Sequence, residues 1–258
     1  MTPDIELGSF SEHWNSKDYL NEFYAPPLVV PDELEAIKFQ VDFLKTLPGK
    51  PLALEFGCGP TAHRTIAVAP YVSEIHMADY VSENLEEVRK WVRKKDDAHD
   101  WRHYVKYILE CEGNLNPLQK EIDEREEMAR VKVSRFIQAD AGKRYPIGIE
   151  FECSYPHVFS GFCADSATTD KTTWEKFMRN IASLVAPGGT FFTAALKNAK
   201  YYKSGDNYFP SANIDEFDLR RVLELDFSPE SITIEVRELP QLAAHGYKGI
   251  LLAHAKKT

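Results

Sequence analysis

The chain has 258 residues, of which 43% are hydrophobic and 28% charged, and its formal net charge is −9 at pH 7. That length suits one large domain with a sizeable core, and the negative charge argues against a general nucleic-acid binder, which needs clustered Lys and Arg. Because no secretory leader, apolar run of membrane-spanning length or zinc-type cysteine spacing is visible, we expect a cytoplasmic monomer without metal whose partner is a small molecule.

Two helices are predicted in the first 48 residues. Residues 14–24 place aromatic and leucine side chains mostly at helical spacing, and a second helix is predicted over 32–45. A strand over 51–56 then leads into a turn with two glycines and a helix from Thr61. A strand over 74–78 precedes Asp79, and Ser82 begins a helix with glutamates in its first turns.

Strands and helices alternate through the rest of the chain. Further strands are expected over 133–139, 157–161, 190–196, 231–238 and 250–255. This alternation favours an α/β fold with an open, largely parallel sheet and helices on both faces. We expect a single domain over 1–258 in which residues 1–48 form a helical lid. The segment 96–130 is predicted to be a helical insertion that either covers the domain as a solvated layer or forms part of a substrate wall.

The first strand ends in the sequence PLALEFGCGPT at residues 51–61. Gly57 and Gly59 allow positive φ and a close approach of the backbone to a ligand. A dinucleotide site prefers GxGxxG, whereas here Ala62 takes the third glycine position and Pro60 follows the second glycine. Glu55 would repel a phosphate and suits a ligand that carries an ammonium group. An ordinary tight turn remains the alternative to a ligand site.

Two more acids follow later strands. Asp79 comes about twenty residues after the turn, as expected for a carboxylate that accepts the hydroxyls of a ribose. Asp140 follows the third strand, where it could accept from an adenine amine. Each acid alone could be a helix cap or a solvated loop residue. In this order, the acids Glu55, Asp79 and Asp140 describe S-adenosylmethionine better than a dinucleotide.

At this point the chain resembles a known family, the small-molecule methyltransferases that include the nicotinamide and phenylethanolamine N-methyltransferases and thioether S-methyltransferase. The similar stretches span nearly the whole chain; they include SKDYLNEFY, EFGCGPT, ADYVSENLEEVRKWV, AHDW, CEGN, RFIQADA, FCADSA and RNIASLVAPGGTFFTAALKNAKYY. The resemblance implies the class I methyltransferase fold, a doubly wound, Rossmann-like and mostly parallel seven-stranded sheet. It also implies S-adenosyl-L-methionine as cofactor and S-adenosyl-L-homocysteine as product.

The resemblance carries site residues onto matching positions. Together with Glu55, the cofactor contacts are expected from Tyr19, Tyr24, Gly57, Cys58, Gly59, Thr61, His63, Asp79, Tyr80, Asn84, Asp140, Ala141, Gly161 and Phe162. The family usually has Tyr where this chain has His63 and Thr where it has Gly161. The implied substrate wall consists of Phe162, Asp165, Ser166, Tyr202 and Ser211.

One departure from the family concerns the acceptor. Where the nicotinamide enzyme carries an aspartate after the fifth strand, this chain reads Ala194-Ala195-Leu196-Lys197. We therefore expect neither nicotinamide nor phenylethanolamine as the substrate. For catalysis, Tyr19 and Tyr24 are expected to close a lid that excludes water, with Tyr19 also holding the cofactor. Asp165 is the candidate general base, with capping of a helix near Thr169 as its alternative role.

The favoured function is transfer of a methyl group from S-adenosylmethionine to a nitrogen of a small amine or N-heterocycle. A first alternative is methylation of sulfur or selenium, or a non-methylating reaction of the cofactor itself such as intramolecular cyclisation. A second is a catalytically silent module that binds the cofactor for regulation. An NAD-dependent oxidoreductase is a more distant alternative, which Glu55 and Pro60 oppose.

Overall fold

The computed structural model describes residues 6–258, and their strands form a seven-stranded sheet and a separate two-stranded hairpin. The sheet order is β3-β2-β1-β4-β5-β9-β8, with β3, β2, β1, β4 and β5 parallel and β9 antiparallel to both of its neighbours. Its strands are β1 (Leu52–Phe56), β2 (Glu74–Asp79), β3 (Val133–Gln138), β4 (Tyr155–Gly161), β5 (Val185–Leu196), β8 (Thr233–Glu238) and β9 (Gly249–Lys256). The predicted doubly wound, mostly parallel sheet is confirmed.

Each predicted strand is present, but β4 and β5 begin two or more residues earlier than the sequence pattern indicated. Strand β4 begins at Tyr155, and β5 begins at Val185, before the pair Gly188-Gly189. The register between these strands shifts between Tyr155 and His157. Because a Pro-Gly-Gly stretch is typical of a turn, the sequence concealed the first residues of β5.

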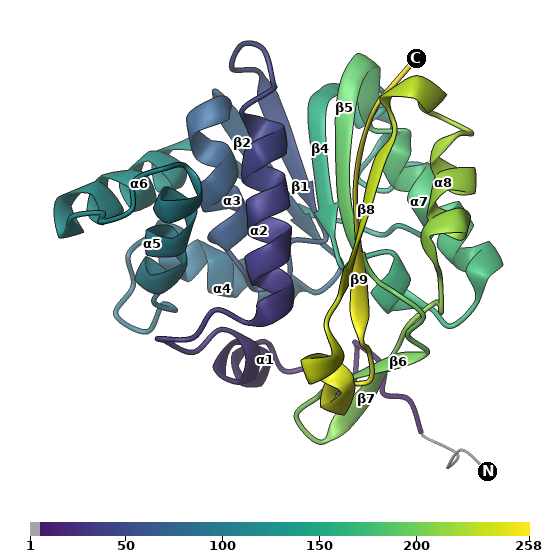
Figure 1. The fold of residues 1–258 in the computed structure, drawn as a ribbon, viewed down its shortest axis with the longest axis horizontal. Helices are drawn as coiled ribbons and strands as arrows, with labels where there is room; N and C mark the ends of the chain where they lie inside the picture. The colour runs from purple at the N-terminus through teal and green to yellow at the C-terminus, as the bar shows by residue number, and fades with distance from the viewer. Residues whose placement is uncertain (1–5) are drawn as a thin grey trace.

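Helices cover both faces of the sheet (Figure 1). One face packs against α2, α3, α4, α5 and α6, while the other face packs against α7 and α8. The helices are α1 (Ser16–Phe23), α2 (Pro31–Leu44), α3 (His63–Val68), α4 (Ser82–Val92), α5 (Arg102–Cys111), α6 (Gln119–Lys132), α7 (Lys171–Ala182) and α8 (Glu216–Leu223). None of the helices within 6–258 is long and apolar enough to cross a membrane.

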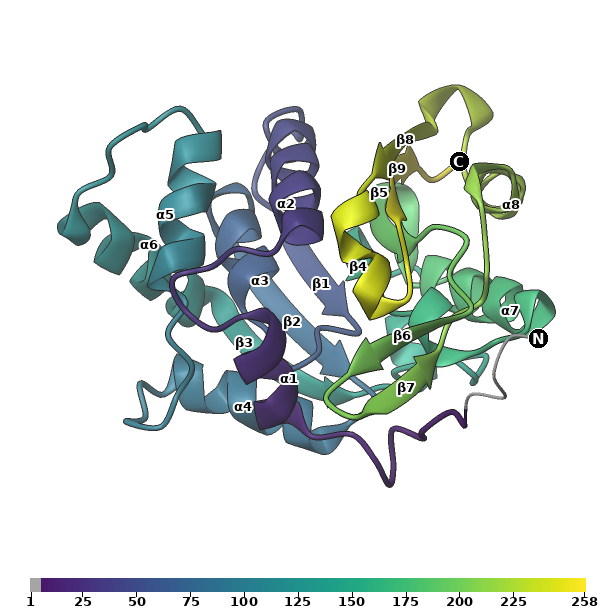
Figure 2. The same ribbon diagram turned by 60° about the horizontal axis from the view of Figure 1, so that its bottom comes forward.

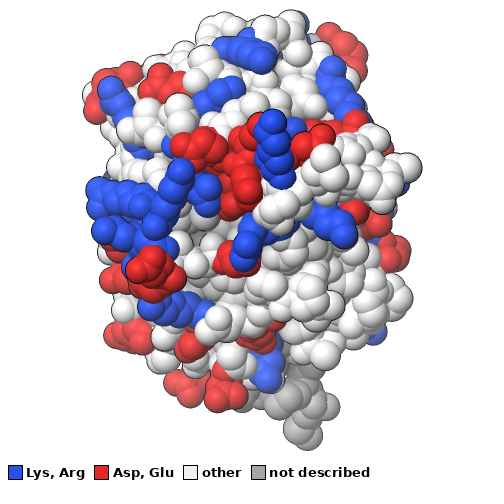
Figure 3. Space-filling model, turned by 90° about the vertical axis from the view of Figure 1, so that its left-hand side faces the viewer, with Lys and Arg blue, Asp and Glu red and all other residues white. Residues whose placement is uncertain are grey.

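The segment 96–130 is helical, as predicted, but its description as a solvated layer is wrong for α5. Trp101, Tyr104 and Ile108 are at most 1% exposed and belong to the core beneath α2 and α3. A helix with such a wide apolar face must bury it against the domain. The outer surface of this region carries intermixed positive and negative side chains (Figure 3). An exposed ion pair between Lys120 and Glu124 on α6 is one example. No residue of 96–130 lines the large cavity described below, so the segment forms no wall of it.

Helix α1 and the hairpin β6 (Tyr201–Ser204) and β7 (Asn207–Pro210) lie across the carboxyl ends of the parallel strands (Figure 2). The hairpin was not predicted from the sequence. The two are joined directly, since the Glu22 carboxylate on α1 accepts from the Gly205 N–H in the hairpin turn at 2.5 Å. Leu7 also forms a β-bridge with Tyr208. The amino-terminal segment and the hairpin together cover the edge of the sheet where α/β proteins bind ligands.

Candidate active site

A cavity of about 590 Å³ lies at the carboxyl ends of the parallel strands, within the size range of small-molecule sites. The strand-end turns supply its floor, while α1, the preceding residues and the hairpin supply its cover. Among the expected site residues, the following line it: Tyr19, Tyr24, Gly57, Cys58, Gly59, Thr61, Asp79, Tyr80, Asn84, Asp140, Ala141, Gly161, Phe162, Ser166 and Tyr202. The structure therefore brings together side chains that are spread over more than 180 residues of sequence.

The glycine turn requires both of its glycines. Gly57 and Gly59 have φ of +69° and +59°, a region that favours glycine. A Cβ at Gly57 would lie 2.2 Å from the Cys163 sulfur, so no larger residue fits there. The N–H groups of Gly57 and Cys58 both donate to the Ala78 carbonyl, which fixes the turn against β2. The turn thus presents a narrow stretch of backbone to the cavity.

Asp79 is a buried carboxylate that organises this turn. Its Oδ2 accepts from the Gly59 N–H at 2.7 Å, and its Oδ1 accepts from the Val81 N–H at 2.8 Å and the Asn84 amide at 2.9 Å. Burial raises its pKa, although these three hydrogen bonds act against the rise. A carboxylate offers about four acceptor positions, so a position remains free on Oδ2. The cavity therefore has one charged acceptor suited to a ribose hydroxyl.

Asn84 connects Asp79 to the cover of the cavity. While its Nδ2 donates to Asp79, its Oδ1 accepts from the Trp14 indole N–H at 2.9 Å and from the Ser16 hydroxyl at 2.7 Å. The Asn84 side chain thus connects the residues at the start of α1 to the Asp79 carboxylate beneath them.

Asp140 lines the same half of the cavity as Asp79. Its Oδ1 accepts from the Gly142 N–H at 2.8 Å. The backbone of β2 and β3 holds the two acids in register, because the Ala139 N–H donates to the Asp79 carbonyl at 2.8 Å. The half of the sheet containing β2 and β3 thus carries both acids expected for ribose and adenine.

Two residues expected at the cofactor lie beneath the cavity and do not line it. Glu55 is 4% exposed, and its side chain lies on the sheet face packed against α2 and α3, because side chains alternate along a strand. Burial raises its pKa to about 7, and its Oε2 has no partner among the described residues. His63 is fully buried, and its Nε2 lies 3.0 Å from Glu33 Oε2. Burial lowers the pKa of His63, although the neighbouring Glu33 carboxylate acts against the fall.

Asp165 and Ser211, expected on the substrate wall, also do not line the cavity. The Asp165 carboxylate accepts from the Leu196 N–H at 2.8 Å and so ties the loop after β4 to the end of β5. Burial raises its pKa to about 6. The alternative role as a helix cap is wrong, because Asp170 caps α7 by accepting from the Thr173 N–H at 2.7 Å. Asp165 is thus placed as a structural link between two strand ends.

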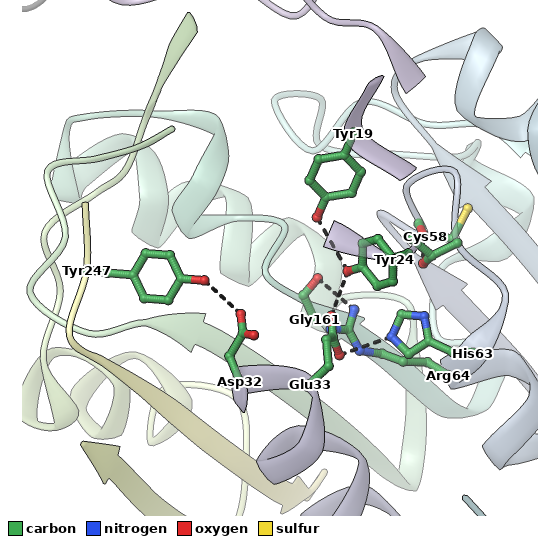
Figure 4. A network of polar contacts seen from close by, with 10 residues as sticks. Tyr19, Tyr24, Asp32, Glu33, Cys58, His63, Arg64, Gly161 and Tyr247 are labelled. Atoms are coloured by element: carbon green, nitrogen blue, oxygen red, sulfur yellow. Dashed lines mark hydrogen bonds and ion pairs between the residues drawn. The ribbon is translucent and has the colours of Figure 1, made fainter. Parts of the chain in front are cut away.

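A buried polar network that sequence reasoning missed lies under the cover of the cavity (Figure 4). Glu33, near the start of α2, accepts from Arg64 at 2.6 and 2.8 Å and from the Tyr24 hydroxyl at 2.7 Å, and it also contacts His63. Burial alone would raise the pKa of Glu33, but Arg64 and His63 outweigh it and hold the pKa at about 2. The Tyr19 hydroxyl extends the network, 3.5 Å from that of Tyr24. Only the acidic first turn of α2 could have signalled these contacts.

The strand order, the glycine turn and the acids after β2 and β3 define a nucleoside-binding α/β enzyme of the class I methyltransferase type. The residues fit S-adenosylmethionine, because Asp79 keeps a free acceptor position and Asp140 lines the same cavity after the next strand. That cofactor would supply an activated methyl group. Structural similarity agrees: a Burkholderia thailandensis 1,6-didemethyltoxoflavin-N1-methyltransferase matches with a TM-score of 0.53 and 16% identity, covering 99% of this chain and 93% of that one.

Sequence comparison then gives the particular family. The model of the NNMT/PNMT/TEMT family matches residues 4–258. Human nicotinamide N-methyltransferase is 28% identical over 233 residues, which cover 88% of this chain and 85% of that protein. Mouse phenylethanolamine N-methyltransferase is 26% identical over 279 aligned positions, covering 100% of this chain and 91% of that protein. The chain belongs to the NNMT/PNMT/TEMT family and is an S-adenosylmethionine-dependent methyltransferase.

Proposed function

We propose that this methyltransferase transfers the methyl group of S-adenosylmethionine to a nitrogen atom of a small amine or N-heterocycle. The observation that carries the proposal is that one cavity reaches from the carboxyl ends of the parallel strands to the hairpin and the loop before β9. One part, at the ends of β1, β2 and β3, carries Asp79 and Asp140, while the other reaches Tyr202 on β6 and Tyr247 before β9. The first part suits the nucleoside, which leaves the second for the acceptor. The similarity to amine N-methyltransferases supports nitrogen as the accepting atom.

The side chains around the second part of the cavity can align the acceptor with the methyl group and exclude water. Tyr19 and Tyr24 on the amino-terminal cover and Tyr202 on the hairpin surround the space with aromatic surface. Holding two reactants in the productive orientation supplies roughly 7 to 11 kcal/mol in favourable cases, enough to carry most of a methyl transfer. We therefore propose that Tyr202 orients the acceptor, that Tyr19 and Tyr24 close over the cofactor and exclude water, and that Asp79 and Asp140 hold the nucleoside.

Labelled methyl transfer tests this function directly. The protein is incubated with methyl-labelled S-adenosylmethionine and a panel containing 2-phenylethylamine, tryptamine, quinoline and dimethyl sulfide, and products are resolved by mass spectrometry. A labelled methyl group on nitrogen is the expected product. Labelled sulfonium only, or loss of the cofactor without any acceptor, would favour sulfur methylation or cyclisation instead. Tight cofactor binding without turnover of any kind would favour a silent binding module.

We further propose that the protein acts as a cytoplasmic monomer in which residues 1–48 and the core form one functional unit. The net charge of −9 supports a protein that binds small molecules and not nucleic acid, and the face in Figure 3 carries positive and negative side chains close together. Light scattering after size-exclusion chromatography tests the monomer, since a species of twice the 29.5 kDa chain mass would contradict it.

A further inference from the structure

Two neighbouring acids at the start of α2 line the cavity, but their surroundings differ. Glu33 has a contact from Arg64, His63 and Tyr24 and is fully engaged. Asp32 has one side-chain partner: its Oδ2 accepts from the Tyr247 hydroxyl at 2.8 Å (Figure 4). Its Oδ1 is buried and has no partner among the described residues, and Asp32 as a whole is 7% exposed. Asp32 therefore lines the cavity with one buried carboxylate oxygen whose acceptor capacity is unused.

No cation within residues 6–258 compensates this charge. Arg64, which belongs to the same network, donates to both carboxylate oxygens of Glu33. No ion pair joins Asp32 to a described Lys, Arg or His. Burial, followed by repulsion from Glu33, raises the pKa of Asp32 to about 6, while the Tyr247 hydroxyl and the first backbone amides of α2 act against the rise. Asp32 is therefore ionised in most molecules at pH 7.5 and carries an unpaired buried charge, which is costly unless a ligand supplies the counterion.

The groups around Asp32 suit a cation better than any other ligand. The wall nearby is aromatic or apolar and includes Tyr19, Phe23 and Val30, and aromatic faces attract cations. Burial raises the pKa of three tyrosine hydroxyls that interact with the Asp32 charge, so they remain neutral. They belong to Tyr19, Tyr104 and Tyr247. A single ammonium group would satisfy the free Oδ1 and balance the charge.

The position of Asp32 assigns that ammonium group to the acceptor. Asp79 and Asp140 follow β2 and β3 on one side of β1, whereas Tyr247, which orients Asp32, immediately precedes β9 on the other side of β4 and β5. The charge thus lies on the half of the cavity away from the nucleoside acids. The end of β5, Ala194-Ala195-Leu196, is apolar, so this strand contributes no acid to that half of the cavity.

We propose that Asp32, held by Tyr247, binds the ammonium group of the methyl acceptor, so that this enzyme selects cationic aliphatic amines over neutral heterocycles. The inference rests on the proposed function, because it specifies the acceptor of that same cavity. Oδ1 accepts a hydrogen bond from the acceptor nitrogen while Oδ2 keeps its bond from Tyr247. The ammonium group passes one proton to Oδ1 before transfer, which frees the nitrogen lone pair that attacks the methyl carbon as the carbon–sulfur bond of the cofactor breaks. The acid that the end of β5 lacks is then supplied by α2.

The test compares a charged probe with a neutral one of nearly the same shape. Binding of 2-phenylethylamine and of 2-phenylethanol to protein saturated with S-adenosylhomocysteine is measured by calorimetry at pH 7.5. We expect the wild type to bind the amine at least 10-fold more tightly than the alcohol. Asp32→Asn should weaken amine binding by about 10- to 100-fold, as for loss of a charged hydrogen bond, and change alcohol binding less than 3-fold. Tyr247→Phe should weaken amine binding by a smaller factor.

Asp42→Asn is the matched control, because Asp42 lies on the same helix with its side chain 64% exposed. It should leave both affinities unchanged. The proposal is overturned if the wild type does not prefer the amine, or if Asp32→Asn retains the preference. It is also overturned if Asp32→Asn weakens S-adenosylhomocysteine binding more than 10-fold, since the ammonium group would then be that of the cofactor. Failure of the proposed function gives a different result, because it is read from the labelled-methyl experiment. The label would then go to sulfur or to no acceptor, whichever probe binds.

Discussion

Replacing Asp79 with Asn is the sharpest test of the nucleoside half of the cavity, because the substitution removes the charge and almost no volume. Asp79 accepts three hydrogen bonds, from Gly59, Val81 and Asn84, at 2.7 to 2.9 Å. An amide has only one oxygen, so its NH₂ group must face the Gly59 N–H or the Val81 and Asn84 donors. The first orientation sets the NH₂ group against one donor and the second sets it against two, and either one disturbs the glycine turn or its link to α4. The ribose also loses its charged acceptor.

The expected loss follows from these contacts. A hydrogen bond to a charged group contributes about 1.5 to 3 kcal/mol, and a misplaced turn adds to the cost. We expect the total to reach about 2 to 4 kcal/mol, a rise of roughly 30- to 1,000-fold in the dissociation constant of S-adenosylhomocysteine. Calorimetric titration measures it, with Asp123→Asn on the exposed side of α6 as the control. A folded Asp79→Asn variant with wild-type affinity would refute the assignment of Asp79 to the ribose.

Three further predictions concern the network around α2. Glu33→Gln should lower the free energy of unfolding by about 3 to 5 kcal/mol in urea titration, because the variant leaves the buried charge of Arg64 without its partner; an unchanged midpoint would contradict this. Tyr19→Phe should lower turnover about 2- to 10-fold with an unchanged melting temperature, whereas wild-type kinetics would return Tyr19 to a packing role. Asp32→Asn should stabilise the ligand-free protein at pH 8. The Asp32 pKa is about 6 when folded against 3.8 for the free side chain, so its ionisation disfavours folding by at most about 3 kcal/mol above pH 6, and the advantage of the variant should vanish as the pH falls to 4. An advantage that does not vary with pH would show that charge is not its cause.

The parallel sheet and the glycine turn could be predicted because local signals specify them. Strand β1 is an apolar run that ends at two glycines, and β2 ends at an acid about twenty residues later. Neighbouring parallel strands end at the same edge, so these residues had to lie close together. The same logic placed Asp140 correctly. The alternation of side chains along a strand also predicts that Glu55 lies on the face packed against α2, away from the cavity. The prediction that Glu55 contacts the cofactor relied only on its position before the turn.

Other parts of the site depend on tertiary contacts without a local signal. Asp32 and Tyr247 are 215 residues apart, and no periodicity connects the start of α2 to the loop before β9. The hairpin of β6 and β7 is short, and its pairing depends on packing against the amino-terminal segment. Helix α5 carries charged residues at most exposed positions, which concealed its buried aromatic face until Trp101 and Tyr104 were seen in the core.

Glu33 and Asp32 are adjacent buried carboxylates that line the same cavity, but within residues 6–258 only Glu33 has a cation as its partner. Glu33 is buried with Arg64, and its pKa falls to about 2, so its charge stabilises the folded state. Asp32, the next residue along the helix, is buried without a cation, and its pKa rises, so its charge destabilises the same state. Replacing Asp32 by a neutral residue should therefore stabilise the ligand-free protein. If Asp32 binds an ammonium group, as we propose, the same replacement should weaken amine binding, so that one substitution acts in opposite directions on stability and on affinity.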